Sequence, residues 1–521
     1  MSESKQGGSL PNFLDRRNFM RLSGGCAALS STSLLSTLVN LKLTNTAVAA
    51  GGDQSGYKAL VCVFFLGGYD SFNVLTPYED AEYADYESAR TNLALPKSQL
   101  LEIAAQNGRR FGIHEGMPEV QDLYSQGKAA FVANVGSLVE PTTKSNYSKV
   151  QKPLGLYSHS DLIQHWQTSV PQSRTQVTGW GGRMADMLTD SVNTHPSIAM
   201  NIALGSLNTF ETGRNVVPYV VQRGSGATPL WGYPNTGTGL NGMYSRATDS
   251  MLGDQYSDLL EKSYSSVRRS SMEAAIDFNA ATGSVEMDTA FPQTNFGRDL
   301  EMVAKTIGAQ STLGQSRQIF FVSVGGWDHH DEVLNRQAGM LPMVSQALKA
   351  FYDATVELGV ANDVTTFTAS DFGRTLSSNG NGSDHAWGGN HIVMGGSVSG
   401  GDIYGDYPET LALNNDLDTG RGRIIPTTAV DQYNAELACW FGVANDSSLE
   451  DVLPNIRNFY SAGSSTPPVG FMSGNSSNRT FGPGGGRGSN GPDLRRGGFG
   501  SNSNSKDQGN DSGGMPPGYG F

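Results

Sequence analysis

The stretch Ala59-Leu-Val-Cys-Val-Phe-Phe-Leu-Gly-Gly-Tyr-Asp70 is an unbroken apolar run that ends in two glycines and an aspartate. A strand with one wet face alternates apolar and polar residues, whereas a run without alternation is typical of a strand buried on both faces, as in a parallel sheet. Glycines after such a run mark a tight turn. The stretch therefore predicts a buried strand of a parallel sheet, with a carboxylate just beyond its end.

Four further runs have the same character, at residues 129–135, 197–203, 318–324 and 363–368. Helical patterns lie between them. One spans residues 298–308 and ends on a glycine, and another spans 341–358 and stops at Gly359. Strands that alternate with helices predict an α/β fold with a mostly parallel central sheet and helices on both faces.

The composition allows a large core and argues against nucleic acid as a partner. The chain has 521 residues, of which 37% are hydrophobic and 16% charged, and its formal net charge is −13. Phosphate backbones need a basic face, and none is evident. An anionic small molecule stays compatible with this charge if bound metal ions attract it. Three cysteines cannot form a disulfide framework, and without a Cys-x-x-Cys pair a redox enzyme is poorly supported.

Residues 1–49 have the features of a twin-arginine signal peptide. Arg16-Arg17 precedes an apolar stretch over residues 22–39, and Ala47-Val-Ala-Ala50 fits a cleavage site after Ala49. The apolar stretch is short and rich in Ser and Thr, so we expect no stable membrane anchor. A lipoprotein at Cys26 is the less favoured alternative. We expect recognition by the twin-arginine export machinery and a periplasmic or secreted protein.

The rest of the chain divides by composition. Residues 50–57 form a polar spacer, and residues 58–460 carry the strands and helices of one large domain. Within it, residues 210–294 have few clear strands and are interpreted as a possible helical or irregular insertion. Residues 461–521 are dominated by Gly, Ser, Asn and Pro, which predicts disorder because the segment offers little apolar surface to bury.

Acidic residues follow three of the predicted strands, and histidines accompany two of them: Asp70; Asp328, His329 and His330; and Asp371, with Asp384, His385 and His391 soon after. Open α/β sheets bind their ligands beyond the carboxyl ends of the strands. Carboxylate with imidazole is a ligand mix suited to zinc, manganese or iron. The alternative is purely local, because aspartates in glycine turns often bond to their own backbone.

Ser158 stands where a helix is predicted to begin, within Tyr157-Ser-His-Ser-Asp161. Its hydroxyl fits two roles, an N-cap of the first turn or a metal-activated nucleophile at a helix N-terminus. A serine–histidine–acid triad is less attractive because no Gly-x-Ser-x-Gly turn is present. Either role leaves the hydroxyl near the start of the helix.

Several motifs occur together in a fixed order: Leu66-Gly-Gly-Tyr-Asp-Ser-Phe-Asn73, Tyr157-Ser-His-Ser-Asp161, Thr178-Gly-Trp-Gly-Gly-Arg183, Gly325-Gly-Trp-Asp-His-His330, Ser370-Asp-Phe-Gly-Arg-Thr375 and His391-Ile-Val-Met-Gly-Gly396. With them, from about residue 58 to about 460, the sequence resembles family 1501 of the domains of unknown function. These are exported proteins related to the alkaline phosphatase and sulfatase superfamily. The resemblance implies an alkaline-phosphatase-like fold and a metal-dependent hydrolase of phosphate or sulfate esters; the alternative is a non-catalytic binding or surface-interaction protein.

The resemblance also implies a site with two divalent metal ions, such as zinc, manganese or calcium. Asp70 resembles the aspartate on one metal. Asp328 and His330 resemble the ligands of the other, with His385 as its third ligand. The choice between His329 and His330 stays open.

Asp371 resembles the first residue of the superfamily's Asp-His pair. Phe372 stands where that pair has its histidine, so His391 is the candidate replacement ligand. By chain order Ser158 corresponds to the nucleophile. Arg374, and also Arg183, are candidates to bind an oxyanion of a small-molecule or surface ester.

Overall fold

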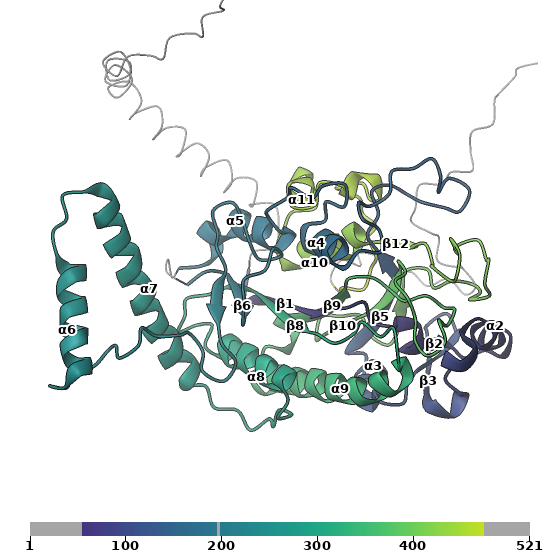
Figure 1. The fold of residues 1–521 in the computed structure, drawn as a ribbon, viewed down its shortest axis with the longest axis horizontal. Helices are drawn as coiled ribbons and strands as arrows, with labels where there is room; N and C mark the ends of the chain where they lie inside the picture. The colour runs from purple at the N-terminus through teal and green to yellow at the C-terminus, as the bar shows by residue number, and fades with distance from the viewer. Residues whose placement is uncertain (1–54, 195–197, 474–521) are drawn as a thin grey trace, which may run out of the picture.

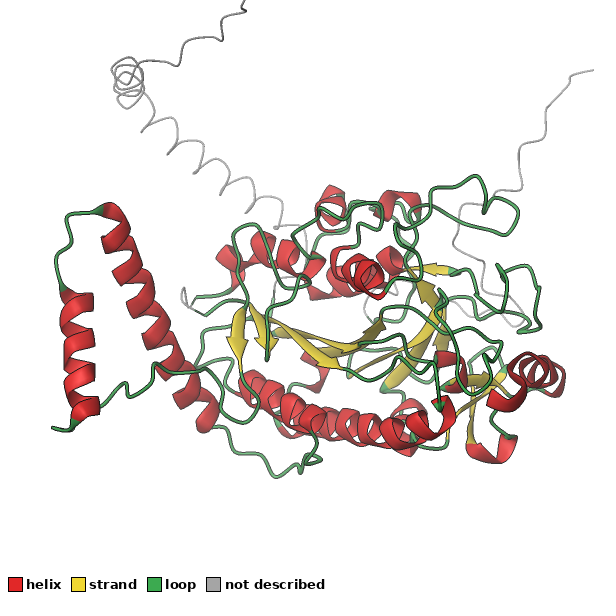
Figure 2. Cartoon of the chain, in the orientation of Figure 1, coloured by secondary structure: helices red, strands yellow, loops and turns green. Residues whose placement is uncertain are grey.

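A central sheet crosses the molecule, with helices on both of its faces (Figure 1). The computed structural model describes residues 55–194 and 198–473. One face is covered by α3 (Pro118–Ser125), α8 (Asn295–Gly308) and α9 (Val333–Glu357). The other is covered by α4 (His159–Thr168), α5 (Trp180–Val192), α10 (Val430–Phe441) and α11 (Ser447–Val452) (Figure 2). The predicted three-layer α/β architecture is confirmed.

The central sheet is mostly parallel, as predicted. Its order is β11 (Ile403–Tyr404), β5 (Ala129–Gly136), β10 (Gly389–Gly395), β9 (Val364–Ser370), β1 (Lys58–Phe65), β8 (Arg317–Val324), β6 (Asn201–Leu204) and β7 (Tyr219–Val221), and β12 (Thr428–Ala429) also pairs with β5. Among the described strands of this sheet, only β10 runs antiparallel to its neighbours, β9 and β5. The four other predicted runs correspond to β5, β6, β8 and β9.

β1 shows why its sequence has no polar alternation. Val61 and Val63 pack into the core beneath α8 and α9, while Leu60, Cys62 and Phe64 pack into a second core with α5 and α10. Each face of the strand is therefore buried against helices. Cys62 is one of these core residues and packs there as a small apolar side chain.

The sequence analysis did not predict two features of the sheet structure. β10 was not identified, because its first residues, Gly389-Asn-His391, are not apolar. A second, antiparallel sheet of β2 (Leu75–Pro77), β4 (Arg110–His114) and β3 (Leu100–Ala104) lies beside α2 (Asp80–Arg90). Short 3-10 turns complete the described chain: Ser71–Asn73, Thr91–Leu93, Lys97–Gln99, Ala361–Asp363 and Ile456–Asn458.

The region predicted as an insertion, residues 210–294, contributes both to the sheet and to a projection from it. β7 forms the edge of the central sheet beside β6. The two helices that follow, α6 (Leu240–Gly253) and α7 (Leu259–Gly283), extend away from the body, and only the end of α7 returns to pack beside α8 (Figure 1).

The packed chain continues past residue 460, the predicted start of disorder. Phe471 is fully buried, and the backbone N–H groups of Val469, Gly470 and Met472 donate to the Glu436 carboxylate. Two buried apolar side chains, Phe471 and Met472, and a buried acceptor hold this segment despite its polar composition. The remainder of the predicted tail, the signal peptide and most of the spacer lie outside the described residues. Among the described helices, none is long and apolar enough to span a membrane.

Candidate functional site

Three loops meet at the carboxyl ends of β1, β8 and β9. Phe65, the last residue of β1, is in register with Val324 of β8 and Ser370 of β9, so the three strands end level. Gly67 permits the loops to touch: its φ is +120°, and a Cβ there would lie 2.5 Å from the backbone nitrogen of Asp328. Only glycine fits such an approach. The polar residues after β8 and β9 are thereby held against the first loop.

Two imidazoles and a carboxylate converge at this edge of the sheet. His159 begins α4, Asp328 follows β8, and His385 lies between β9 and β10. One ligand atom of each lies within 4.8 Å of the other two. His159 Nε2 is 3.4 Å from Asp328 Oδ2, and His385 Nε2 is 3.4 Å from Asp328 Oδ1. We call these three residues the His–Asp–His cluster. Asp328 and His385 are among the ligands predicted from the sequence, and His159 is not.

Each histidine of the cluster is oriented by a partner on its other nitrogen. His159 Nδ1 lies 2.6 Å from Asp371 Oδ2, and His385 Nδ1 lies 2.7 Å from the Tyr157 carbonyl oxygen. Because an ionised carboxylate and a carbonyl only accept, both Nδ1 atoms carry the proton. The Nε2 lone pairs then face the cluster. His159 Nε2 is buried and has no hydrogen-bond partner.

His330, also predicted as a ligand, lies at the side of the cluster. Its Nε2 is 2.9 Å from His385 Nε2 and 3.1 Å from Asp328 Oδ1, and its Nδ1 is 3.1 Å from Asp384 Oδ1. Neighbouring His329 instead points into the interior, where both its ring nitrogens are buried without a partner. Of the two adjacent histidines, His330 therefore lies beside the cluster and His329 lies away from it.

Burial and neighbouring charges shift the pKa values at the site. Burial acts to raise the pKa of Asp328, but the hydrogen bond and charge of Arg374 outweigh it and lower the pKa below its usual value. For Asp371 burial dominates, and its pKa is raised despite the bond to His159. Burial lowers the pKa of His385, which favours the neutral imidazole that binds metal.

Arg374, predicted to bind an oxyanion, uses its donors inside the protein. It is fully buried, and it donates to the carbonyl oxygens of Gly68 at 2.7 Å, Ser383 at 3.0 Å and Gly67 at 2.6 Å. It also contacts the Asp328 carboxylate. These bonds tie the loops after β1 and β9 together and orient Asp328. Arg183 is similarly committed to backbone carbonyls between α4, α5 and α11.

Asp70 and His391 are not brought to the cluster. Asp70 is fully buried, and its Oδ2 accepts from Arg90 Nη2 at 2.5 Å and from the Ser383 hydroxyl at 3.2 Å. His391 lies within β10, among the rings of Trp166, Tyr69 and Tyr433, and burial lowers its pKa to about 3. One carboxylate is paired with a guanidinium, and the imidazole belongs to an aromatic core.

Ser158 occupies the N-cap position of α4, directly before His159. Its hydroxyl makes no capping hydrogen bond to the helix backbone. Instead it lies 3.2 Å from the Ser160 hydroxyl, and it also bonds to Asp161. The hydroxyl is thus half-exposed beside the first residue of the His–Asp–His cluster.

Two arginines from the loop between β11 and β12 stand at the rim of the cluster. Arg421 Nη2 pairs with Asp384 Oδ2 at 2.5 Å, and Arg423 Nε donates to the His385 carbonyl oxygen at 3.1 Å. The cluster is open beside them, because the side chain of Asp328 is 47% exposed and that of His159 32%. Positive side chains at an open rim attract anions.

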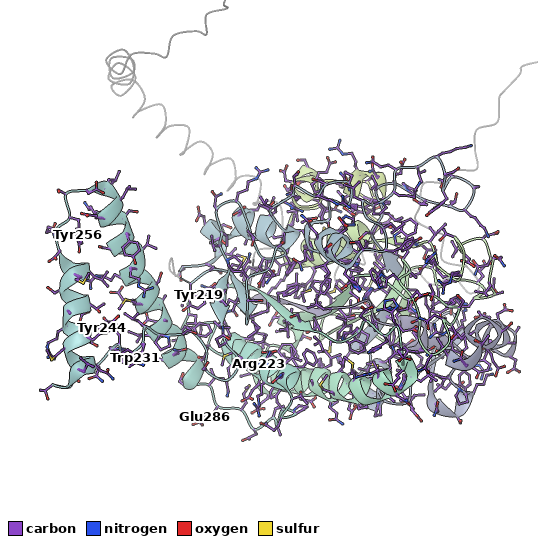
Figure 3. All side chains as sticks on the ribbon, viewed as in Figure 1. Tyr219, Arg223, Trp231, Tyr244, Tyr256 and Glu286 are labelled. Atoms are coloured by element: carbon purple, nitrogen blue, oxygen red, sulfur yellow. The ribbon has the colours of Figure 1, made fainter. Side chains whose placement is uncertain are left out.

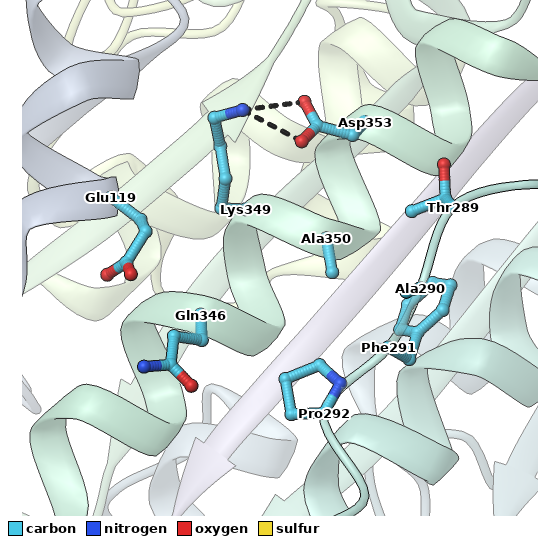
Figure 4. A pocket seen from close by; sticks show the side chains of 9 residues that line it. All are labelled: Glu119, Thr289, Ala290, Phe291, Pro292, Gln346, Lys349, Ala350 and Asp353. Atoms are coloured by element: carbon cyan, nitrogen blue, oxygen red, sulfur yellow. Dashed lines mark hydrogen bonds and ion pairs between the residues drawn. The ribbon is translucent and has the colours of Figure 1, made fainter.

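A hollow of about 570 Å³ lies elsewhere on the surface. Figure 4 shows it between α3, α9 and residues 289–292, with Lys349 bonded to Asp353. No residue of the His–Asp–His cluster lines it. Lys349 is paired with Asp353, and Glu119 accepts a hydrogen bond from Ser345, so the cluster is the stronger candidate site.

Comparison with protein families gives one match. The profile described as "Protein of unknown function (DUF1501)" matches residues 57–416. The chain belongs to this family. No curated protein matches the DUF1501 chain.

Solved structures similar to the DUF1501 chain include the C-terminal periplasmic domain of EcEptC from Escherichia coli, with 9% identity and a TM-score of 0.33 over 78% of this chain and 88% of that one. The PsFucS1 sulfatase from Pseudoalteromonas sp. has 10% identity and a TM-score of 0.30 over 78% and 70% of the two chains. Likenesses this weak carry no argument about activity.

Sequence reasoning on the DUF1501 chain missed His159 although it considered the residues beside it. Ser158 was the predicted functional residue because a hydroxyl is the expected nucleophile, and no role was assigned to the imidazole of His159. The signal that could have identified His159 is its chemical type. An imidazole can complete a set of metal ligands with the carboxylates and imidazoles that follow the strands. A histidine at a helix start, close to the sheet edge, is the residue to examine.

Proposed function

We propose that the protein is an exported, metal-dependent hydrolase of phosphate or sulfate esters whose metal is held by His159, Asp328 and His385. The observation that carries the proposal is their convergence, with one ligand atom of each within 4.8 Å of the others. Three protein ligands with solvent access on one side are what a catalytic metal site requires.

The donor set fits a divalent transition metal. Two neutral imidazoles and one carboxylate suit zinc or manganese, whereas calcium prefers oxygen ligands alone, so calcium is the least suitable of the three expected ions. The orphaned, buried Nε2 of His159 is the polar atom that such an ion would satisfy. Bound there, the ion would supply Lewis-acid chemistry.

The protein's own side chains would then orient the ligands and the substrate. Asp371 fixes the tautomer of His159, and Arg374 fixes the position of Asp328. Arg421 and Arg423 at the rim would attract the negative charge shared by phosphate and sulfate esters. Ser158 keeps its role as a candidate nucleophile because its half-exposed hydroxyl belongs to the residue directly before His159.

The proposal is tested by the metal content of the folded protein and by hydrolysis of aryl phosphates and aryl sulfates. We expect about one equivalent of zinc or manganese. His159→Ala should lower metal affinity by more than about 100-fold, since even partners of metal ligands contribute 10–100-fold. His391→Gln is the matched control and should retain the metal.

The outcomes separate the parts of the proposal. Retention of metal in His159→Ala, or its loss in His391→Gln, would contradict the ligand set. Loss of turnover in Ser158→Ala with metal retained supports the serine as nucleophile, and full turnover in that variant rejects it.

A non-catalytic binding protein is the alternative, and one contact favours it. The Phe372 ring lies 4.8 Å from the His159 ring and 4.5 Å from the His385 ring, measured between centroids, so an apolar side chain lines the cluster. Under this alternative the protein binds metal but turns over neither class of ester.

A further inference from the structure

The two helices that project from the body form a hairpin with little support from the rest of the molecule. We call residues 231–271 the arm; it contains α6 and the first half of α7, joined by a short turn (Figures 1 and 3). α6 packs against α7 and not against the central sheet or its covering helices. The arm therefore exposes most of its surface.

The arm places large apolar side chains outside and small residues inside. Gly242 and Ser245 of α6 are buried, as is Ser265 of α7. The large side chains are exposed: Leu240 75%, Tyr244 43% and Met251 63% on α6, and Leu260 78%, Tyr264 70% and Val267 64% on α7. A helix in water normally turns such residues towards a partner. The arrangement is that of a hairpin whose apolar side awaits another surface.

On each helix these residues form a single stripe. Leu260, Tyr264 and Val267 recur at i, i+4 and i+7, which is one face of an α-helix. Leu240, Tyr244 and Met251 recur at i, i+4 and i+11, which is again one face. Two continuous stripes on a two-helix hairpin are what the halves of a four-helix bundle present to one another.

The area of the stripes matches a protein interface. At roughly 100–200 Å² for each of six exposed side chains, the two stripes offer on the order of 800 Å², the area that each partner contributes to a standard protein–protein interface. Isolated monomers seldom expose an apolar patch of that size.

Charge along the arm is self-complementary. Acidic residues outnumber basic ones at its tip, where Asp254, Asp258 and Glu261 stand with Lys262. Basic residues outnumber acidic ones about two turns from the tip, where Arg246, Arg268 and Arg269 stand with Asp249. Two arms packed side by side in opposite directions would set each acidic tip beside the other's basic middle. The arm carries four basic and four acidic residues, so it lacks the positive excess that an anionic lipid surface attracts.

We propose that the arm is a self-association element, and that two copies of this chain dimerise by packing their arms in antiparallel fashion into a four-helix bundle. The dimer has the closed two-fold symmetry in which the same patch of both copies forms the interface. This inference does not depend on the proposed metal site, which lies on the body of the protein.

The oligomeric state of the full chain tests the proposal. Sedimentation over micromolar concentrations should show a dimer, and Leu260→Glu with Val267→Glu should weaken association by more than about 100-fold. Leu207→Glu, which alters an exposed leucine outside the arm, is the matched control and should leave the dimer intact. Circular dichroism of each variant reports whether the fold is kept.

Charge exchange gives an independent readout. Arg268→Glu with Arg269→Glu in one chain, and Glu261→Lys in another, should each weaken the homodimer, while mixing the two chains should restore a heterodimer. A full chain that stays monomeric overturns the proposal, whether its arm instead binds anionic vesicles or is protected by residues 474–521. So does a dimer that the arm variants leave unchanged.

Discussion

The pairing of Arg90 with Asp70 bears on the number of metal ions in the proposed site. The Arg90 guanidinium lies against Asp70 in the interior, and neither side chain is exposed. A buried carboxylate has to be paired, and Arg90 supplies the charge that a second metal ion would otherwise provide. With Phe372 in place of a histidine as well, we propose one metal ion for the site, where the family resemblance implies two.

The Asp371 carboxylate is a positioning group, since it acts through His159. Asp371→Asn should lower metal affinity about 10–100-fold, because an amide can donate to Nδ1 and so favour the tautomer with its proton on Nε2. Titration of zinc into the metal-free protein measures the effect. Asp384→Asn, on the far side of His330, should change affinity less, and an equal loss in both variants would argue against a specific role of Asp371.

Buried histidines make the stability of the protein sensitive to acid. Burial lowers the pKa of His165 from 6.5 to about 4; the charge of Asp161 opposes this shift, and the charge of Arg174 adds to it. The stability that its neutral form contributes is present above pH 6.5 and is lost as the pH falls towards 4, since the unfolded chain takes up the proton first. That difference in pKa corresponds to about 3 kcal/mol.

The test compares unfolding of the original protein and of His165→Gln by urea between pH 7 and pH 4. The variant should lose less stability on acidification. Parallel pH profiles would show that His165 is not the titrating group.

At the level of residues, the sequence indicated which side-chain types could form the site, but it did not show which of those residues lie close together. Asp328 and His385 are recognisable because carboxylates and imidazoles follow predicted strands. His391 also follows β9 in the chain, but it lies within β10, where its side chain points into the aromatic core. No spacing in the sequence indicates this orientation. Asp70 has the expected position after β1, and only the fold reveals Arg90 beside it.

At the level of elements, the continuous apolar runs predicted five central strands, because a strand buried on both faces needs apolar residues at successive positions. β10 has no such continuous apolar run. Its polar residues Asn390 and His391 are accommodated in the interior by a hydrogen bond and by ring contacts with residues distant in sequence. The segment after residue 460 was predicted to be disordered for a related reason. Its composition is polar, and a few long-range contacts hold it in place.

The anchoring of that segment can be measured. Phe471→Ala should cost about 3–5 kcal/mol, the usual range for removing a buried phenylalanine side chain. Urea unfolding measures the difference in free energy, with Val356→Ala as the control because Val356 is 53% exposed. A cost as small as the control's would mean that the segment is not part of the cooperative fold.

At the scale of the whole molecule, the projection of the hairpin of α6 and α7 could not be predicted from the sequence pattern. The apolar residues of α6 and α7 recur at helical spacing, and nothing in the sequence indicates that Gly242 and Ser245 are buried against residues 232–237 while the large side chains are exposed. Fold class depends on local burial and was predictable. The exposure of an apolar stripe depends on contacts distant in sequence, which a local pattern does not encode.

Export is a property of the whole chain and is tested through residues outside the described part. Arg16→Lys with Arg17→Lys should leave the precursor in the cytoplasm, because the twin-arginine route reads the pair itself. Cell fractionation followed by immunoblotting measures the distribution. Arg21→Lys is the matched control, and normal export of the double variant would contradict the proposed route.

The position of β1 has a consequence for the time at which the protein can fold. The hydrogen bond between Phe65 and Ser370 joins residues 305 positions apart, so the first strand of the sheet leaves the ribosome long before its β9 neighbour exists. At typical rates of synthesis the wait is roughly 15–60 s. Throughout it, an eight-residue apolar β-forming segment has no permanent partner. Nascent chains of this protein should therefore depend on chaperones until β8 and β9 emerge, and translation stalled between β1 and β8 should leave aggregation-prone chains.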